Sequence, residues 1–337
     1  MSKLTTIAID AMGGDNAPEA IVHGAMEALK ENDNVKIVLV GTKDPVDAEV
    51  DKYDYPKDRL ELVYTTEEID MGDHPVQAIR QKKDSSMVVA MKMLKEGTVD
   101  AMISAGSSGA LLAGGQLVVG RVKGVERAPF APILPTETGA TLLIDSGANV
   151  DASPSHLVQY AKMGDIYYQC AMGKKPTVGI VNIGLEEEKG NKLVKETFPL
   201  LKECKDINFV GSVEAREIPA GAVDVVVCDA FTGNVIVKLY EGMAKTLLHI
   251  IKAGLMTSLK SKIGALLIKK SLKDTLKQFD AAEHGGAPML GLNGLLIKTH
   301  GNSSHMEIKN AVKQCLACIE QGITEKMRAA FAEKNEE

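Results

Sequence analysis

Tryptophan is absent from the 337-residue chain, and aromatic residues make up only 4% of it. Surfaces that stack bases or sugar rings usually carry more rings, so the composition speaks against both kinds of binding protein. The net charge of −6 also excludes a chain that is basic as a whole, as nucleic-acid-binding proteins commonly are. The five cysteines are odd in number and far apart, which argues against a secreted disulfide framework.

Long apolar runs are also missing. No stretch approaches the ~18 uncharged apolar residues that a membrane span requires. The N-terminal apolar run is short and is interrupted by Asp10, unlike the core of a signal peptide. Hydrophobic residues make up 45% and charged residues 25% of the chain, the balance of an ordinary folded domain. We therefore expect a folded protein of the cytoplasm.

Three motifs of enzyme chemistry are missing as well. The sequence has no G-x-x-x-x-G-K-[ST] nucleotide loop, no G-x-G-x-x-G after the first strand and no G-x-S-x-G elbow. Cys315 and Cys318 form a single C-x-x-C in a helical run, which favours buried thiols over a metal site. We expect neither a cofactor nor a bound metal.

Apolar runs typical of strands alternate with helical patterns along nearly the whole chain. The predicted strands are 6–10, 36–40, 60–64, 101–104, 141–145, 177–182, 208–213, 224–228 and 295–299, and the main helices between them are 18–30, 87–95, 155–170, 193–203 and 235–249. Several strands are uninterrupted apolar runs, as strands buried on both faces are. The pattern predicts an α/β fold, a mostly parallel sheet with helices on both faces, built as one large unit over residues 1–337.

Six predicted strands end in turns rich in Gly, Asn, Ser and Asp. These turns are 9–18, 103–110, 144–154, 181–191, 227–235 and 297–304. Because parallel strands end at the same edge of a sheet, we expect the turns to converge on one crevice. Turns of this composition also cap helices in proteins without any site there, but their number favours an active edge.

Two of these turns have the features of an anion site. Segment 104–109 precedes a predicted apolar helix at 110–119, and segment 232–234 precedes the helix that begins near Val235. Glycine allows backbone N–H groups to approach a ligand, and a helix N-terminus attracts negative charge. Phosphate or another oxyanion is the predicted ligand, although plain N-capping explains either turn taken alone. The candidate residues are Ser104, Gly106, Ser107, Ser108, Gly109, Thr232 and Gly233.

Further polar residues lie in the same turns. Lys189 is a mobile cation near the anion site if its turn faces the crevice, and part of a solvated charge run if it does not. A carboxylate at a strand end can hold a cation or a hydroxyl group, or cap its turn. The other crevice candidates are Asp10, Gly13, Gly14, Asn149, Asp145, Asp229 and His300.

Residues 246–277 are both basic and apolar. This segment has seven Lys and one Asp, so its net charge is +6 while the rest of the chain carries −12. Leucine and isoleucine recur there at i+4 spacing, and a break near 256–262 would make a helical hairpin. An apolar stripe with a lysine face is typical of a helix on an anionic membrane. The predicted contacts are Leu255, Leu259, Lys260, Lys262, Ile263, Leu266 and Leu267; an acidic partner, a second subunit or the protein's own body are the alternatives.

Ten motifs give the chain a family resemblance. They are DAMGGDNAP (10–18), PVQAIRQKKDSSM (75–87), ISAGSSGAL (103–111), GRVKGVERAP (120–129), LPT (134–136), DSGANVD (145–151), KGN (189–191), DAFTGNV (229–235), GGAP (285–288) and HGNSS (300–304). On these motifs the chain resembles the PlsX family, the bacterial acyl-carrier-protein:phosphate acyltransferases. It departs from the family pattern at Ser107, Ser108 and Ala230.

The resemblance implies a homodimer with a Rossmann-like fold, related to the isocitrate dehydrogenase and phosphotransacetylase folds. It also implies an enzyme of phospholipid synthesis that moves a long-chain acyl group from acyl carrier protein to inorganic phosphate. The acyl phosphate then passes to a membrane glycerol-3-phosphate acyltransferase, with the enzyme held peripherally at the inner face of the membrane. A thioester and phosphate need no covalent enzyme intermediate, only positioning and stabilisation of an oxyanion.

The two anion turns would then hold phosphate. Lys189 and Asn234 would stabilise the oxyanion or the leaving thiolate, with Asn149 and His300 as further catalytic candidates. The acidic carrier is expected to dock on Arg80, Lys82, Lys83, Arg121 and Lys123. The alternatives are a phosphotransacetylase-like enzyme that uses acyl-CoA, and a non-catalytic membrane scaffold for lipid enzymes.

Overall fold

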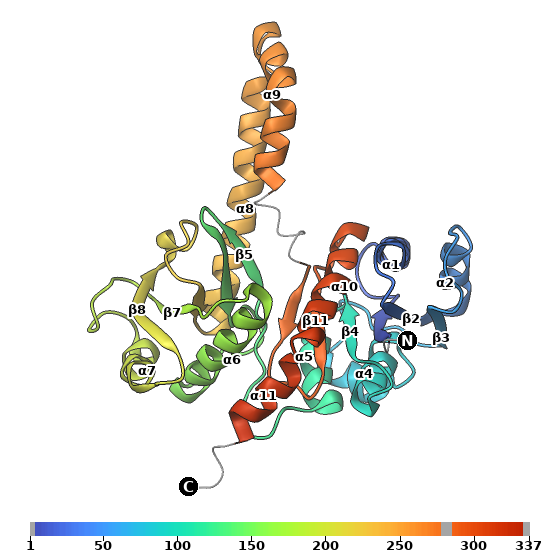
Figure 1. Cartoon of the computed structure of the whole chain (residues 1–337), viewed down its shortest axis with the longest axis horizontal. Coiled ribbons are helices and arrows are strands. Elements are labelled where there is room, and N and C mark those ends of the chain that lie inside the picture. Colours follow the sequence, from blue (N-terminus) through green and yellow to red (C-terminus); the bar gives the residue numbers. More distant parts are fainter. Residues whose placement is uncertain (1–3, 278–284, 333–337) are drawn as a thin grey trace.

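The strands form two sheets (Figure 1) in the computed structural model, which describes residues 4–277 and 285–332. The first sheet has the order β10-β11-β4-β1-β2-β3. Its strands are β1 (Thr5–Asp10), β2 (Val35–Thr42), β3 (Leu60–Thr65), β4 (Ala101–Ser104), β10 (Ala287–Met289) and β11 (Leu295–Lys298). All its neighbours pair in parallel except β10 with β11.

The second sheet has the order β5-β6-β9-β7-β8. Its strands are β5 (Ile133–Thr136), β6 (Gly139–Ile144), β7 (Thr177–Asn182), β8 (Asn208–Glu214) and β9 (Val225–Val227). Only β5 pairs antiparallel, with β6. The predicted α/β fold with mostly parallel strands is confirmed, but the strands are shared between two sheets rather than gathered in one.

All nine predicted strands are present, each within two residues of the expected ends. The two that the sequence patterns missed, β5 and β10, are antiparallel edge strands of three or four residues. Each contains a proline, Pro135 or Pro288, and proline in an apolar run lowers the expectation of a strand.

Helices cover the sheets and pack between them. The predicted helices correspond to α1 (Glu19–Glu31), α4 (Ser86–Glu96), α6 (Pro154–Met172), α7 (Lys192–Glu203) and the much longer α8 (Ala230–Leu255). The helix expected at 110–119 is α5 (Ser108–Gly114) followed by a π-helical turn, Gly115–Val119. The remaining ones are α2 (Lys43–Val50), α3 (Pro75–Gln81), α9 (Leu259–Lys277), α10 (His305–Glu320) and α11 (Ile323–Ala332).

One hydrophobic core runs through both halves of the molecule. The largest cluster of buried side chains includes Ile7 and Ile9 of β1 together with Ile144, Val178 and Val225 of the second sheet. Helices α6 and α10 contribute to the same cluster and lie against each other. The two sheets are therefore held in a fixed relation by shared apolar packing.

Helices α8 and α9 stand away from this body as a helical hairpin (Figure 1). Helix α8 ends at Leu255 and α9 begins at Leu259, which confirms the predicted break. The first arm is longer than the predicted segment because α8 already starts at Ala230, where Asp229 caps it. In the part of the chain that the structure describes, no helix has both the length and the hydropathy to cross a membrane.

Gly233 lets the base of α8 lie directly on the second sheet. A Cβ atom at this position would overlap the carbonyl oxygen of Asp145. Gly242, further along the same helix, has open space around it.

We expect Gly233→Ala to lower the free energy of unfolding by at least about 2 kcal/mol, because backbone must move to admit the methyl group. Gly242→Ala is the matched control and should raise stability by about 0.5–1 kcal/mol through helix propensity. Urea unfolding followed by circular dichroism measures both. Equal effects of the two substitutions would contradict the close packing at Gly233.

Candidate active site

Three loops meet at the carboxyl edge of the first sheet. The backbone N–H of Asp15 donates to the carbonyl oxygen of Gly301 at 2.6 Å. The side-chain amide of Asn16 donates to the carbonyl oxygens of Asn302 and Ser303 at 3.0 and 3.1 Å. These bonds hold the loop after β1 against the loop after β11.

Asp10 is the buried centre of this edge. The hydroxyl of Ser104 donates to its carboxylate at 2.6 Å and in turn accepts the N–H of Gly106 at 3.0 Å. Burial raises the pKa of Asp10, and the bond from Ser104 opposes that shift. A Cβ on Gly13 would lie 2.6 Å from the carboxylate, so glycine is required there. Asp10, Ser104 and the Gly106 N–H are thus engaged with one another inside the protein.

The other candidate residues of the predicted phosphate turn are Ser107, Ser108 and Gly109, and one of them is also used in a hydrogen bond within the protein. Ser107 is buried and caps α5 by accepting the N–H of Ala110 at 3.4 Å. Ser108 is exposed and Gly109 is partly so. Among the predicted anion-binding residues of this turn, these two remain at the surface.

Asp145 organises the carboxyl edge of the second sheet. Its buried carboxylate accepts the backbone N–H groups of Phe130, Gly147, Ala148 and Asn149 at 2.8–3.2 Å. The side-chain amide of Asn149 adds a fifth bond at 2.8 Å. The same amide reaches the carbonyl oxygen of Ala128, so Asn149 positions its loop rather than pointing freely outward.

A hollow of about 400 Å³ lies among the loops that follow β6, β7 and β9. Its lining is Val150, Asp151, Ala152, Asn191, Leu193, Asp229, Phe231 and Thr232. Asp229 accepts the N–H and the hydroxyl of Thr232 at 2.9 and 2.7 Å, which caps α8. Asn234, one turn into α8, is exposed. The structure thus brings together three predicted turns around a concave surface at the start of the longest helix.

Lys189 is exposed in the loop between β7 and α7. The side chain of Asn182 fastens that loop by donating to the Lys189 carbonyl oxygen at 3.3 Å. Asn191, two residues further on, lines the hollow. Lys189 is therefore two residues from a residue that lines the hollow, and it lies on a solvent-exposed turn.

Apolar side chains surround this second edge, and the sequence patterns missed them. Phe231 is 66% exposed and lines the hollow together with Val150. Ile183 is 78% exposed and Leu185 is also exposed, both in the Lys189 loop. The available signal was the presence of large apolar residues within turns that are otherwise polar.

The six turns are divided, three to each sheet. Gly106 and His300 belong to the first edge, whereas Lys189 and Gly233 belong to the second. His300 is exposed and its ring accepts the N–H of Asn302 at 3.4 Å. The expectation of a single edge shared by all six turns is corrected accordingly, because strand periodicity does not say which strands pair.

The segment 128–131 joins the two edges. It hydrogen-bonds to β10 through Ala131 and, on its other side, to Asp145 and Ser146 through Phe130. Ala148 packs against the buried cluster of the first sheet. The loop after β6 is therefore anchored on both halves of the molecule.

Lys298 is a further residue of the edge that the sequence patterns missed. It ends β11, and its ammonium group donates to the carbonyl oxygen of Thr299 at 3.0 Å. Burial, followed by the charge of Lys238 on α8, lowers the pKa of Lys298 to about 8. The signal in the sequence was a lysine at the end of an otherwise apolar strand.

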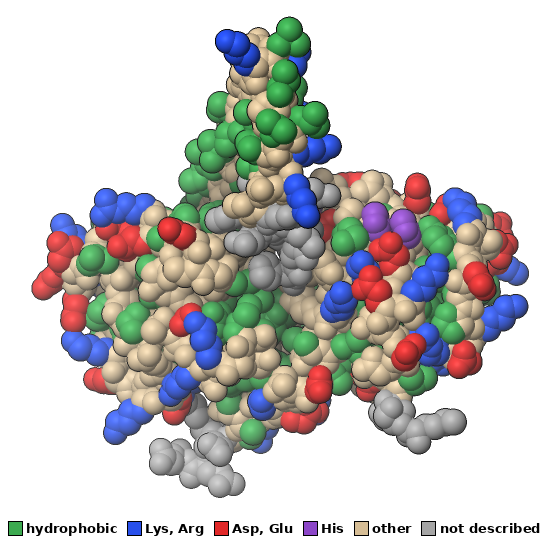
Figure 2. All heavy atoms as spheres, turned by 45° about the horizontal axis from the view of Figure 1, so that its top comes forward, with side chains coloured by type: hydrophobic (Ala, Val, Ile, Leu, Met, Phe, Trp, Pro, Cys, Tyr) green, Lys and Arg blue, Asp and Glu red, His purple; other side chains and the backbone are tan. Residues whose placement is uncertain are grey.

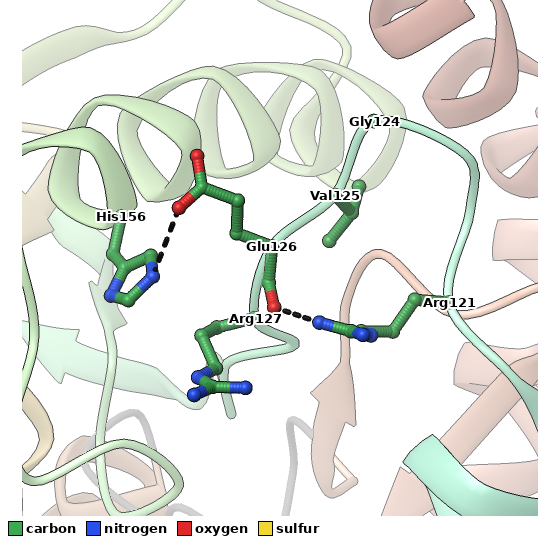
Figure 3. A pocket seen from close by; sticks show the side chains of 6 residues that line it. All are labelled: Arg121, Gly124, Val125, Glu126, Arg127 and His156. Atoms are coloured by element: carbon green, nitrogen blue, oxygen red, sulfur yellow. Dashed lines mark hydrogen bonds and ion pairs between the residues drawn. The ribbon is translucent and has the colours of Figure 1, made fainter.

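A second hollow, of about 440 Å³, lies beside the N-terminus of α6 (Figure 3). Arg121, Arg127 and His156 line it, but Arg121 donates to the backbone carbonyl of Glu126. The Glu126 carboxylate lies 3.2 Å from the ring of His156. Arg127 makes neither of the contacts drawn in the figure, and it is exposed.

The cysteines offer no nucleophile at either edge. Burial raises the pKa of the Cys228 thiol well above its ordinary value. Cys315 and Cys318 are buried on α10, as their helical spacing predicted. A buried, protonated thiol is a poor nucleophile, so these cysteines are poor candidates for a covalent thioester intermediate.

The family model described as "Fatty acid synthesis protein" matches residues 5–326. The chain belongs to this family. The predicted resemblance to the PlsX family is confirmed, and the protein is an acyltransferase. A relative from Clostridium acetobutylicum named phosphate acyltransferase is 48% identical over 330 residues, covering 98% of this chain and 99% of its own. One of the same name from Alkaliphilus oremlandii is 51% identical over 320 residues, covering 95% of each chain.

Solved structures support the fold. A phosphotransacetylase from Streptococcus pyogenes superposes with a TM-score of 0.60 at 16% identity, covering 95% of each chain. A 4-hydroxythreonine-4-phosphate dehydrogenase from Klebsiella pneumoniae gives a TM-score of 0.53 at 13% identity, covering 94% of this chain and 99% of its own. The predicted relation to the phosphotransacetylase fold is confirmed.

Lys298 makes stability depend on pH in a defined window. Because its pKa is lowered in the folded state, the unfolded chain binds more protons there between about pH 8 and its ordinary pKa of 10.5, and stability rises with pH. Lys298→Met should be more stable than wild type at pH 7, and this advantage should shrink by about 1–2 kcal/mol by about pH 9.5. Urea unfolding at the two pH values measures the difference. An advantage that does not change with pH would show that Lys298 is not desolvated.

Proposed function

We propose that the protein transfers a long-chain fatty acyl group from acyl carrier protein to inorganic phosphate. The observation that carries the proposal is the 48–51% identity, over nearly the whole chain, to relatives named phosphate acyltransferase. A phosphate oxygen attacks the thioester carbonyl carbon and forms a tetrahedral oxyanion. The oxyanion collapses, the carbon–sulfur bond breaks, and acyl phosphate and the free carrier thiol leave.

The second edge supplies the groups that this reaction needs. Phosphate binds at the N-terminus of α8, a helix of 26 residues. The aligned peptide dipoles of a helix give its N-terminus a partial positive charge, which attracts an anion. Asn234 donates from the first turn of α8, and Lys189 closes over the hollow from its exposed loop to stabilise the oxyanion or the leaving thiolate. Ser108 and Gly109 of the first edge are a second place for phosphate, and His300 lies beside that edge.

The acyl chain follows the apolar side chains that rim the hollow. Val150 and Phe231 line it, and Ile183 and Leu185 lie in the neighbouring loop, all four exposed. Covering these side chains with an acyl chain removes apolar surface from water on both partners. The thioester carbon is thereby drawn to the polar end of the hollow.

The acidic carrier protein docks on exposed basic residues of the loop between the π-helical turn Gly115–Val119 and β5. Arg121 and Lys123 of the predicted patch are exposed. Lys82 is engaged in ion pairs with Asp70 and Asp73, which weakens its part in the patch. Complementary charge speeds such encounters and makes them sensitive to salt.

The hairpin serves two further contacts. Figure 2 shows hydrophobic side chains over its surface with lysines among them. On the outer half of α9, Leu259 and Leu267 are each 79% exposed, and we assign this part of the hairpin to the inner membrane surface. Along α8, Leu239, Met243 and Leu247 form an exposed i+4 row, which a second copy of the chain covers in a homodimer. Acyl phosphate formed here is released close to the membrane enzyme that transfers it to glycerol 3-phosphate.

The reaction is tested by release of free carrier thiol from acyl-acyl carrier protein as phosphate is added. Thiol release should rise and saturate with phosphate. Lys189→Ala should lower kcat by about 100-fold if its charge stabilises the oxyanion. Lys192→Ala, which removes another exposed lysine three residues away, should leave kcat within about two-fold.

Two outcomes contradict parts of this scheme. Turnover with acyl-CoA but not with the carrier thioester would assign the protein to phosphotransacetylase-like chemistry. Equal kcat values for Lys189→Ala and Lys192→Ala would remove Lys189 from the mechanism while leaving the reaction itself in place.

Membrane contact is tested by flotation with vesicles that contain anionic lipid. The double substitution Leu259→Glu with Leu267→Glu should reduce the bound fraction at least ten-fold, since it places two negative charges on the apolar outer half of α9. Val210→Glu, at an exposed apolar residue of β8, is the control and should bind as wild type does. Binding that survives the double substitution would contradict the assignment of the outer half of α9 to the membrane. Size-exclusion chromatography of the same variants reports the dimer separately.

A further inference from the structure

Two histidines and a glutamate gather where α1 meets α10, outside both carboxyl edges. His23 and Glu27 are four residues apart on α1, and His305 is the first residue of α10. The rings of His23 and His305 stack with their centres 4.1 Å apart. The Glu27 carboxylate lies 3.6 Å from the His23 ring nitrogen and 4.0 Å from that of His305. Within the described residues, no other His, Cys, Asp or Glu trio has potential ligand atoms so close together.

The fold builds this juxtaposition from backbone packing. A Cβ at Gly24 would lie 2.5 Å from the carbonyl oxygen of His305, so glycine allows α10 to begin directly against α1. The ring of Tyr53 lies beside His23, 5.5 Å away between ring centres. Positions i and i+4 of a helix share a face, which turns His23 and Glu27 toward the same neighbour.

Glu27 is left with an unsatisfied atom. Its Oε2 is buried and has no hydrogen-bond partner in the structure. Lys309 forms an ion pair with that oxygen at 3.6 Å, and its hydrogen bond goes to Glu31 at 2.8 Å. A buried carboxylate oxygen that makes only a long ion pair and no hydrogen bond is incompletely satisfied, and a metal ion bonded to it directly would satisfy it fully.

We propose that His23, Glu27 and His305 form a binding site for a divalent transition-metal ion, with Zn²⁺ as the best match. Two imidazoles and one carboxylate, with water as the fourth ligand, are a set that Zn²⁺ accepts and that Mg²⁺ and Ca²⁺ disfavour. The three potential ligand atoms lie within 4.8 Å of one another. A tetrahedral site with bonds of about 2.1 Å requires separations of about 3.4 Å.

Side-chain rotation is enough to close that gap. Each of the three side chains is roughly a third exposed, so the stacked rings can turn until their nitrogens face one ion. Lys309 keeps Glu31 as its partner when the ion takes its place beside Glu27. The bound ion would fasten the first turn of α10 to α1. Because the loop after β1 leads into α1 and the loop after β11 leads into α10, the ion stiffens the first edge.

The site is tested on tag-free, metal-free protein by titration with Co²⁺ and competition with Zn²⁺. One Co²⁺ per chain should give the visible absorption of a four- or five-coordinate ion, and Zn²⁺ should remove it. His23→Ala and His305→Ala should each weaken Zn²⁺ binding at least ten-fold by calorimetry. His249→Ala, which removes an exposed histidine of α8, should bind as wild type does. Unchanged Zn²⁺ binding in both alanine variants would overturn the proposal. So would the absence of binding to wild type at about 0.1 mM Zn²⁺.

Thermal unfolding gives a second, independent readout. Zn²⁺ should raise the Tm of wild type and of His249→Ala, because it binds the folded chain only, and should not raise that of His305→Ala. Lys309→Met removes the competing cation and should tighten Zn²⁺ binding several-fold. An equal rise in Tm for wild type and His305→Ala would place the ion elsewhere and overturn the proposal. None of these readouts uses acyl transfer, so they stand or fall apart from the proposed function.

Discussion

The loops at both edges depend on a buried aspartate at the end of a strand. Asp145 accepts five hydrogen bonds from the loop that follows it and from Phe130, and Asp10 holds Ser104, which holds Gly106. Burying a carboxylate costs several kcal/mol unless hydrogen-bond donors surround it. Each aspartate therefore stabilises the one conformation of the neighbouring loops in which their donors point at its carboxylate. The two residues are organisers of turns, and their burial keeps them away from any reactant.

This rigidity suits the chemistry of acyl transfer to an oxyanion. Four of the five cysteines are buried, and the groups that the edges present are backbone donors at helix starts and a few exposed polar side chains. The second edge combines these with exposed apolar groups such as Phe231 and Ile183. A polar hollow with an apolar rim fits a substrate that has a charged nucleophile at one end and a hydrocarbon chain at the other.

The sequence predicted the elements better than their pairing. Apolar runs typical of strands identified nine strands. The edge strands β5 and β10 were missed because they are short and contain Pro135 and Pro288. Hydrophobic period and propensity carry no information on which strand lies beside which, so the division into two sheets was not visible. The hairpin was visible, since its apolar stripe and its break are local features.

The sequence located the turns of the candidate site, but it did not show which of their polar groups can still contact a ligand. Motifs identified the turns that contain Ser104, Gly106 and Thr232. In the structure, the hydroxyl groups of Ser104 and Thr232 and the N–H of Gly106 are all engaged in hydrogen bonds within the protein. Lys298 escaped because one lysine at a strand end looks like an ordinary boundary. Spacing identifies a turn, whereas only coordinates tell which of its donors still face solvent.

Hydrogen exchange of the amides around Asp145 tests the central claim most directly. The N–H groups of Phe130, Gly147, Ala148 and Asn149 should exchange as slowly as those of β6, although three of the four lie in an irregular loop. In Asp145→Asn the four should lose protection together, because one carboxylate accepts them all. Rapid exchange of these amides in wild type, or unchanged protection in the variant, would contradict the view that this aspartate builds the edge.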